Sequence, residues 1–526
     1  MKQQTLKALT NAHAWVGLVI STILFLVFLG GSFSLFRENI VSWERDTLYS
    51  QSKPQVDVGL DVMVNNVYNQ YEVDQHHPFY IRFPEGQKSH FEVYFAEEDE
   101  NGNEIDFNLL VSSETGEILT PADRFIYGDF LYDLHVDLHL GELGKYLVGF
   151  VTLFFFVAVL SGVVIHWRKI VNNFFQYRKD GKKDKWLDAH NLIGVMGLPY
   201  HIMYAFTGLV FNLVIIYQIA YAVLLYQADQ NALLADAGYV DTRVEMTGVA
   251  QPIDGLQELY ERAQNELGSV NINFANIQNI GDETSTIRFS GNDPELFSTR
   301  KEIEYVISSG EVSYKTLDNF DNDVRSGLAI IASLHFADFA GYGLRLLFFV
   351  LGIGTCYLIL TGNLMWIEKR AKQRKHSVIG LHIVKALSTG VFVGSLVATA
   401  VGFVLARILP PQMAERSDMI FNAFFITMFV CLAVAFVYKN QQVLSVLFLR
   451  ITSILMVSVP LLDWIYVSEG INELLVQGRL DVLVVESIAV VFAVCCWVIS
   501  RHMSKSQQAA KIEPVQSDEE PVPSAA

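Results

Sequence analysis

Eight apolar segments, each long enough to cross a lipid bilayer, constrain this 526-residue chain more than any other feature. A membrane-spanning helix needs about 20 consecutive, mostly apolar residues, because the hydrocarbon core is about 30 Å thick. The predicted spans are 15–37, 143–167, 190–226, 343–367, 379–408, 418–438, 444–466 and 481–500. The first is kept as an anchor, because its apolar run is too long for a signal peptide. The sequence therefore predicts a polytopic α-helical membrane protein.

Basic residues at the ends of these helices predict the topology. They gather before the first helix, between the second and third, between the fourth and fifth, and after the sixth and eighth. All of these places lie on one side of the membrane if both termini are cytoplasmic, as the positive-inside rule expects. We therefore expect a multi-pass membrane protein with both termini in the cytoplasm.

Two long segments between helices are predicted to fold on the periplasmic side. Residues 40–130 and 227–330 each show strand-like alternation with a helical stretch, and they share a turn phrase, Ser113–Glu117 in one and Ser308–Glu311 in the other. A unit of helix, outer α+β domain and helix thus occurs twice. The predicted organisation is helix 1 in 1–39, an outer domain in 40–130, helices 2 and 3 in 131–226, a second outer domain in 227–330, helix 4 in 331–370, four further helices in 371–503 and a disordered cytoplasmic tail in 504–526.

Composition disfavours several classes of function. The net charge is −18, and no basic face exists outside the short cytoplasmic loops, so nucleic-acid binding is disfavoured. The four cysteines all fall in predicted helices, which leaves no disulfide framework and no iron–sulfur spacing. The sequence contains no P-loop, nucleophile elbow, zinc-protease motif or dinucleotide fingerprint after a strand.

Histidines recur at fixed spacing beside the apolar segments. One pattern, His-x3-Gly-x13-Gly, occurs three times, and a second pattern places a Leu-His pair 27 residues before the glycine of a Ser-Gly or Thr-Gly pair. The copies are His13-Gly17-Gly31, His190-Gly194-Gly208 and His376-Gly380-Gly394, and then His135 with Ser161-Gly162 and His335 with Thr361-Gly362. Histidine is rare inside membranes and is usually functional there. Two pairs of equivalent histidines, one near each membrane face, predict two metal-cofactor sites stacked across the bilayer.

These phrases resemble a known family over about residues 1–370. The segment Leu134–Tyr146, leading to Ser161-Gly162, resembles the second helix of the PepSY-associated transmembrane family, and Leu334-His335 leading to Thr361-Gly362 resembles its fourth. The motifs at His13 and His190 are similar to its first and third helices, and the outer turn phrases resemble PepSY domains. Members include bacterial inner-membrane reductases of ferric siderophores that hold two b-type haems. The resemblance implies two haems b and a ferric siderophore or another ferric chelate on the periplasmic side, with helices 5–8 as an addition.

The four paired histidines are the expected axial ligands. His135 and His335 lie at the outer ends of predicted helices 2 and 4, and His13 and His190 at the cytoplasmic ends of helices 1 and 3. Two histidines on one haem iron leave no open position, which suits electron transfer. The helix rises about 27 Å from His13 to Gly31, so the two sites would lie toward opposite faces. Four glycines would let helices approach closely or make room for a macrocycle: Gly31, Gly162, Gly208 and Gly362.

Other residues are secondary candidates. His201 lies about 16 Å deeper than His190, so it is either bonded to a neighbour or itself a ligand. His139 is expected one helical turn from His135, where it could replace that ligand or shield the haem edge. His166, Arg168 and Arg345 are candidates for binding haem propionates, against the simpler possibility that the arginines reach lipid headgroups. His376 has no evident histidine partner, so no third site is expected.

The expected function is an oxidoreductase that passes electrons from the cytoplasmic haem to the outer haem and on to a ferric chelate. No domain that binds NADPH or flavin is visible, so the donor would be a separate cytoplasmic protein or a membrane quinol. One alternative is a non-redox accessory or regulatory protein whose outer domains bind a peptide or protein. Another is a transporter of iron chelates, which paired polar residues in broken helices would support.

Overall fold

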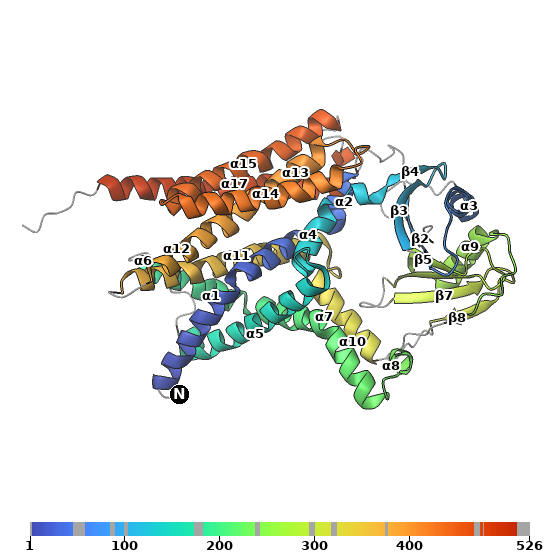
Figure 1. Ribbon diagram of the computed structural model, residues 1–526, viewed down its shortest axis with the longest axis horizontal. Helices are drawn as coiled ribbons and strands as arrows, with labels where there is room; N and C mark the ends of the chain where they lie inside the picture. The colour runs from blue at the N-terminus through green and yellow to red at the C-terminus, as the bar shows by residue number, and fades with distance from the viewer. Residues whose placement is uncertain are drawn as a thin grey trace, which may run out of the picture. The chain divides into compact units, whose positions relative to one another are not determined.

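The computed structural model describes residues 3–45, 58–84, 90–98, 102, 104–172, 182–236, 242, 244–293, 300–316, 323–373, 377–467, 474–476 and 478–512 (Figure 1). The chain divides into two compact units, which are described separately below. The first comprises residues 1–369, 409–419 and 469–485, and the second comprises 370–408, 420–468 and 486–526. Within the described residues, seven helices are long and apolar enough to cross a membrane, and a bent pair of helices brings the number to eight. The prediction of a polytopic α-helical membrane protein is confirmed.

The first unit contains four of these spans together with shorter helices. The spans are α1 (Gln3–Ser34), α5 (Gly141–Asn172), the bent pair α6 (Lys182–Met196) with α7 (Leu198–Leu225), and α11 (Gly341–Ala371). The shorter helices are α2 (Arg37–Glu44), α4 (Tyr127–Val136), α8 (Gln230–Asp236) and α10 (Asp323–Phe336). The long apolar runs form these helices because a helix satisfies every backbone hydrogen bond within itself, as lipid requires.

The third predicted span is broken rather than continuous. We expected one helix over 190–226, but α6 ends at Met196 and α7 begins at Leu198, with a bend of 67° between them. Pro199 lies in the first turn of α7 and has no N–H to donate to the preceding turn. A kink at this position is therefore expected from the proline, and Gly197 supplies the flexible link.

His135 and His335 do not lie on the long spans, contrary to the prediction. They lie on the short helices α4 and α10, and α5 and α11 begin only at Gly141 and Gly341. Both of these glycines have positive φ, 59° and 64°, a conformation that suits glycine at the start of the long helix. The same arrangement occurs in both repeats, so the turn is part of the duplicated unit.

The two outer segments form one antiparallel sheet. Its eight strands run in the order β4-β3-β2-β1-β5-β6-β7-β8. The strands are β1 (Phe79–Arg82), β2 (His90–Glu98), β3 (Glu104–Ser112), β4 (Ile118–Pro121), β5 (Asn271–Gln278), β6 (Thr286–Asn292), β7 (Arg300–Val306) and β8 (Val312–Lys315). Helices α3 (Leu60–Gln70) and α9 (Leu256–Leu267) contribute to its core, and a 3₁₀ turn η2 (Ala122–Arg124) follows β4.

The join between the two halves is the pairing of β1 with β5. Phe79 lies opposite Ile277, and Arg82 lies opposite Phe274. We expected two separate domains, but each half alone would leave this strand as an open edge with unpaired backbone groups. Joining the edges removes that exposure and merges the apolar residues of both halves into one core, in which Val64 and Ile81 pack with Ile277.

The second unit contains the four additional spans, except for two short end segments. The spans are α12 (Val378–Leu387), which continues through a π-helical stretch η3 (Ser388–Val393) into α13 (Gly394–Ile408), then α14 (Arg416–Val437), α15 (Gln441–Tyr466) and α17 (Leu480–Ile512). The end segments, 416–419 of α14 and 480–485 of α17, belong to the first unit. A buried ion pair joins Arg407 of α13 to Asp463 of α15. Part of the predicted tail is helical instead, because α17 extends to Ile512; the rest of that prediction, residues 513–526, lies outside the described part of the chain.

Candidate functional site

Four histidines of the first unit form two pairs. The first histidine pair is His13 on α1 and His190 on α6, with ring centroids 6.4 Å apart and ring planes at 87°. The second histidine pair is His135 on α4 and His335 on α10, with centroids 5.9 Å apart and planes at 39°. The predicted pairing of these histidines is thus the pairing that the structure has.

The spacing of both pairs matches two imidazoles on opposite sides of one metal. A metal–imidazole bond is about 2 Å long, and the nitrogen lies about 1.1 Å from the ring centre, so two trans imidazoles have centroids about 6 Å apart. The observed 5.9 and 6.4 Å both fall at this value. Rings in direct hydrogen-bond contact or stacked face to face would lie closer together.

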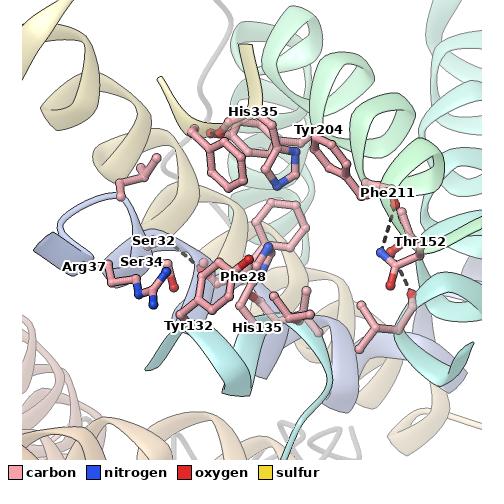
Figure 2. Close-up of a pocket in the computed structure, with 18 of the residues that line it drawn as sticks. Phe28, Ser32, Ser34, Arg37, Tyr132, His135, Thr152, Tyr204, Phe211 and His335 are labelled. Carbon is pink, nitrogen blue, oxygen red and sulfur yellow. Dashed lines mark hydrogen bonds between the residues drawn. The ribbon is translucent and has the colours of Figure 1, made fainter. Parts of the chain in front are cut away.

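The second histidine pair borders a cavity of about 580 Å³. Figure 2 shows His335 and Tyr204 on one side of it and His135 and Tyr132 on the other. The lining is mostly apolar and aromatic, with Phe28, Phe155 and Phe211 among its residues. A volume of this size lies within the range of about 300–1,000 Å³ that is typical of ligand and cofactor sites.

Hydrogen bonds place a proton on Nδ1 of both rings in the second pair. His135 Nδ1 lies 2.8 Å from the carbonyl oxygen of Val27, which can only accept. His335 Nδ1 lies 2.7 Å from the hydroxyl of Thr207. That hydroxyl donates its own proton to the carbonyl of Met203 at 2.9 Å, so it accepts from His335.

The first pair follows the same rule. His13 Nδ1 lies 2.9 Å from the hydroxyl of Ser161, which donates to the carbonyl of Ala158 at 3.0 Å. His190 Nδ1 lies 3.0 Å from the carbonyl of Leu358 and 3.2 Å from the hydroxyl of Thr361. Both rings therefore carry their proton on Nδ1.

All four rings consequently present an Nε2 lone pair. No hydrogen bond to any of these four Nε2 atoms occurs within the described residues. A neutral imidazole that donates through one nitrogen and offers the other is the form in which histidine binds metals. Burial lowers the pKa of His135, and burial together with the neighbouring His135 lowers the pKa of His335 to about 3, so both rings are neutral at physiological pH.

Repeated glycines lie beside three of the four rings. A Cβ added to Gly31 would lie 2.6 Å from Nδ1 of His135. The corresponding distances are 3.5 Å from Gly162 to Cε1 of His13 and 3.4 Å from Gly362 to Cε1 of His190. The fourth predicted glycine, Gly208, instead contacts Thr152, at 3.3 Å. Only Gly31 therefore leaves space that a Cβ would take from a ring, whereas a Cβ at Gly162 or Gly362 would make ordinary van der Waals contact with its histidine.

Arg345 could pair with a carboxylate bound in the cavity. It lines the cavity of the second pair, and its Nε atom is buried with no hydrogen-bond partner among the described residues. Lys145, at the equivalent place in α5, also lines the cavity and forms an exposed ion pair with Glu142 at 2.6 Å. His166 is half-buried in α5, and the side chain of Arg168 lies outside the described residues.

His201 and His139 have other partners. His201 Nε2 lies 3.0 Å from the hydroxyl of Thr355, whose proton goes to the carbonyl of Leu351, so this nitrogen is the donor. His139 Nε2 lies 2.9 Å from the carbonyl of Phe130. The expectation that His139 shares a helix face with His135 is wrong, because α4 ends at Val136 and His139 has a φ of 57°. His376 lies outside the described residues.

The sequence prediction gave no role to the residues that hold the rings. Ser161 and Thr361 were noted only as part of a repeat, and Thr207 was not noted. The sequence pattern could have identified these three residues, because each of them immediately precedes one of the repeated glycines. Val27 acts through its backbone carbonyl, which no side-chain pattern can reveal.

Neither pair could hold a bare metal ion firmly. Structural and catalytic zinc sites use three or four protein ligands, whereas each pair offers two. In the described part of the chain, no group of three or more histidine, cysteine or acidic side chains is placed to hold an ion. The arrangement therefore suits a metal that brings its remaining ligands with it, as a porphyrin does.

Comparison with known proteins separates the region that holds the histidine pairs from the additional helices. A family model described as the PepSY-associated TM region matches residues 10–369. An uncharacterized protein of Pseudomonas aeruginosa is 26% identical over 294 residues, which cover 54% of this chain and 73% of that protein. The matched family region contains both histidine pairs, and helices α12 to α17 lie beyond it.

Proposed function

Because this chain belongs to the PepSY-associated transmembrane family, we propose that it carries electrons across the membrane through two haems b, each held by one histidine pair. The observation that carries the proposal is the common state of the four rings. Each ring donates Nδ1–H to a fixed acceptor and offers Nε2. The rings form two pairs, and within each pair the ring centroids lie about 6 Å apart. A structural role alone would not require this arrangement four times.

The residues fit the cofactor at three further points. The cavity at the second pair has the size and apolar lining that a macrocycle needs. Gly31 leaves the His135 ring the room to stand beside α1. Arg345 brings a buried guanidinium nitrogen to the same cavity, where a propionate would pair with it.

The chain's own part in electron transfer is to hold, bury and separate the two sites. The iron, when bound, supplies a one-electron carrier with no open coordination position. Along α1, His13 and the Val27 carbonyl that bonds His135 are separated by about 21 Å, so the two pairs lie at different depths. Leu24 lies between these two positions on α1 and is buried with Phe155 in one apolar cluster.

The direction and partners belong to the same proposal. With both termini in the cytoplasm of a bacterial cell, the first pair faces the cytoplasm and the second faces the periplasm. A cytoplasmic protein or a membrane quinol would donate, and a ferric siderophore or other ferric chelate would accept at the periplasmic side. Reduction to Fe(II) weakens binding by hard oxygen ligands, so the acceptor would release its iron.

A haem count tests the proposal. The full chain, purified from haem-replete cells, is expected to contain two haems b, with a reduced-minus-oxidised spectrum typical of low-spin bis-histidine haem. His13→Ala and His335→Ala should each lose one haem. His382→Ala is the matched control, because His382 Nε2 bonds the carbonyl of Phe436 in the second unit. A folded but colourless chain, or histidine variants that keep both haems, would overturn the proposal.

A further inference from the structure

We infer that Ser161, Thr361 and Thr207 are positioning residues that set the planes of the axial imidazoles, so that the two sites hold electronically different haems. The inference rests on the proposed function and extends it to residues that would not touch the iron. It starts from a difference between the pairs. The ring planes of the first pair are perpendicular, at 87°, whereas those of the second pair are at 39°.

The acceptor of each Nδ1–H determines the plane of its ring. Once Nε2 points at a metal, the ring can still rotate about the metal–nitrogen axis. The Nδ1–H bond lies in the ring plane, so an acceptor at a fixed place selects one rotation. Hydrogen-bond partners of ligating histidines act in this way in metal sites generally.

In the first pair, the acceptors come from equivalent places in the two repeats. Ser161 on α5 holds His13, and Thr361 with the Leu358 carbonyl on α11 holds His190. Both hydroxyls donate to the carbonyl three residues earlier in their own helices. Their orientation is therefore fixed by the helix, and the two rings are held perpendicular.

In the second pair, the repeats differ. Thr207 on α7 accepts from His335, but the equivalent position on α1 is Gly30. A Cβ at Gly30 would lie 2.9 Å from the Leu131 carbonyl oxygen, so α1 and α4 are too close for a side chain there. His135 therefore uses the Val27 carbonyl instead, and the two planes meet at an oblique angle.

Ring orientation changes the electronic structure of ferric haem. An imidazole donates from its π system into the iron d orbital that lies perpendicular to the ring plane. Perpendicular rings raise two different d orbitals and leave them nearly equal in energy, whereas rings closer to parallel raise the same orbital and split the pair. The first case gives a single, very large g value in electron paramagnetic resonance, and the second gives three well-separated g values.

The test is an electron paramagnetic resonance spectrum of the oxidised, detergent-extracted full chain with both haems bound. We expect one large-g signal and one three-component signal of equal integrated intensity. Ser161→Ala should shift the large-g signal and leave the other unchanged. Thr361→Val should shift the large-g signal less, because the Leu358 carbonyl still accepts from His190. Thr207→Val should shift only the three-component signal. In a potentiometric titration of the same samples, each variant should change the midpoint potential of the corresponding haem only.

The repeats supply the conservative controls. Ser161→Thr and Thr361→Ser exchange hydroxyl for hydroxyl between equivalent positions and should keep the wild-type spectrum. Thr452→Val removes a buried hydroxyl that donates to the Phe448 carbonyl of its own helix, and it should change neither signal. If Ser161→Ala loses its haem altogether, it gives no large-g signal to compare. In that case Ser161→Thr and Thr361→Ser test the inference, and a shifted large-g signal in either variant contradicts it.

Failure of the inference and failure of the proposed function look different. Two haems with indistinguishable signals, or a Thr207→Val change at the large-g signal, would overturn the positioning roles while leaving electron transfer in place. A chain that binds no haem would overturn the proposed function itself.

Discussion

Gly31 and His135 are in direct contact, so closely that a Cβ on Gly31 would lie 2.6 Å from Nδ1 of the imidazole. The same Nδ1 donates to the carbonyl of Val27, one turn earlier in α1. One helix therefore both holds this ring and leaves the space that it occupies. The second glycine of the His-x3-Gly-x13-Gly pattern is explained at this copy by a steric requirement of the ring.

Gly31→Ala is expected to displace His135 and remove the haem of the second pair. The added methyl group cannot coexist with the ring, and relief by a shift of α4 would cost about 1–3 kcal/mol as overpacking. The haem-to-protein ratio should fall by half, measured by the pyridine haemochrome assay. Gly17→Ala is the control on the same helix, because a Cβ there meets nothing within 4 Å. Retention of both haems by Gly31→Ala would contradict this account of the site.

His135→Ala and His139→Ala are expected to differ. His135→Ala should lose one haem, since it removes one of the two imidazoles of the second histidine pair. His139→Ala should keep both, because His139 Nε2 donates to the carbonyl of Phe130. The same pigment count distinguishes them, and loss of haem only in His139→Ala would transfer the ligand role to His139.

The membrane helices could be predicted closely because lipid imposes a length and a composition. Predicted and observed spans agree to within a few residues at most ends, as for 379–408 against Val378–Ile408. The break at Gly197 was missed because apolarity continues through it, although Pro199 marks the place where a hydrogen bond must fail.

The sheet and the site show where sequence reasoning ends. Both halves of the sheet were visible as alternating segments, but the pairing of β1 with β5 joins residues far apart in the chain, and no local pattern specifies it. Internal repetition did predict which histidines meet. It could not predict the ring planes, because one acceptor is a backbone carbonyl and another depends on how closely α1 approaches α4. The haems themselves stay a prediction.

Arg416→Leu is expected to destabilise the first unit strongly. Arg416 and Glu44 form a buried ion pair at 2.6 Å, and Glu44 also accepts from the backbone N–H of Tyr127. Removing one partner of a buried pair leaves the other charge without compensation, at a cost of about 3–5 kcal/mol. Thermal or denaturant unfolding in detergent would measure it.

The control for that variant is an exposed pair of similar length. Glu142→Gln removes the charge that pairs with Lys145 at 2.6 Å. The side chain of Glu142 is 63% exposed and that of Lys145 is 42% exposed. Such pairs contribute at most about 1 kcal/mol. Equal effects of the two substitutions would show that burial of the Arg416–Glu44 pair does not matter.

Asp282 is expected to make the sheet domain less stable in acid. Its carboxylate accepts from the hydroxyl and N–H of Thr284 and from the N–H groups of Thr247 and Gly248, and these bonds hold its pKa well below the usual range. The folded state therefore binds this proton less readily than the unfolded chain. The stabilisation is complete above the unfolded value of about 4 and fades as the pH falls below it.

The matching variant is Asp282→Asn. It should unfold at a lower temperature than wild type at neutral pH, and the gap should close as the pH falls below about 4. A gap that stays constant with pH would mean that the carboxylate charge contributes nothing.

His201→Leu is expected to keep both haems. His201 stands eleven residues after His190, and the residue at the same distance from His13 is Leu24, so the variant restores the residue of the first repeat. Its Nε2 donates to Thr355, and the Thr355 hydroxyl already donates to Leu351, so no donor loses its partner when the ring is removed. A stability loss of about 1 kcal/mol, the value of one hydrogen bond, is expected. Haem content and the paramagnetic spectrum should match wild type; loss of either haem would make this imidazole a ligand and displace one of the four assigned here.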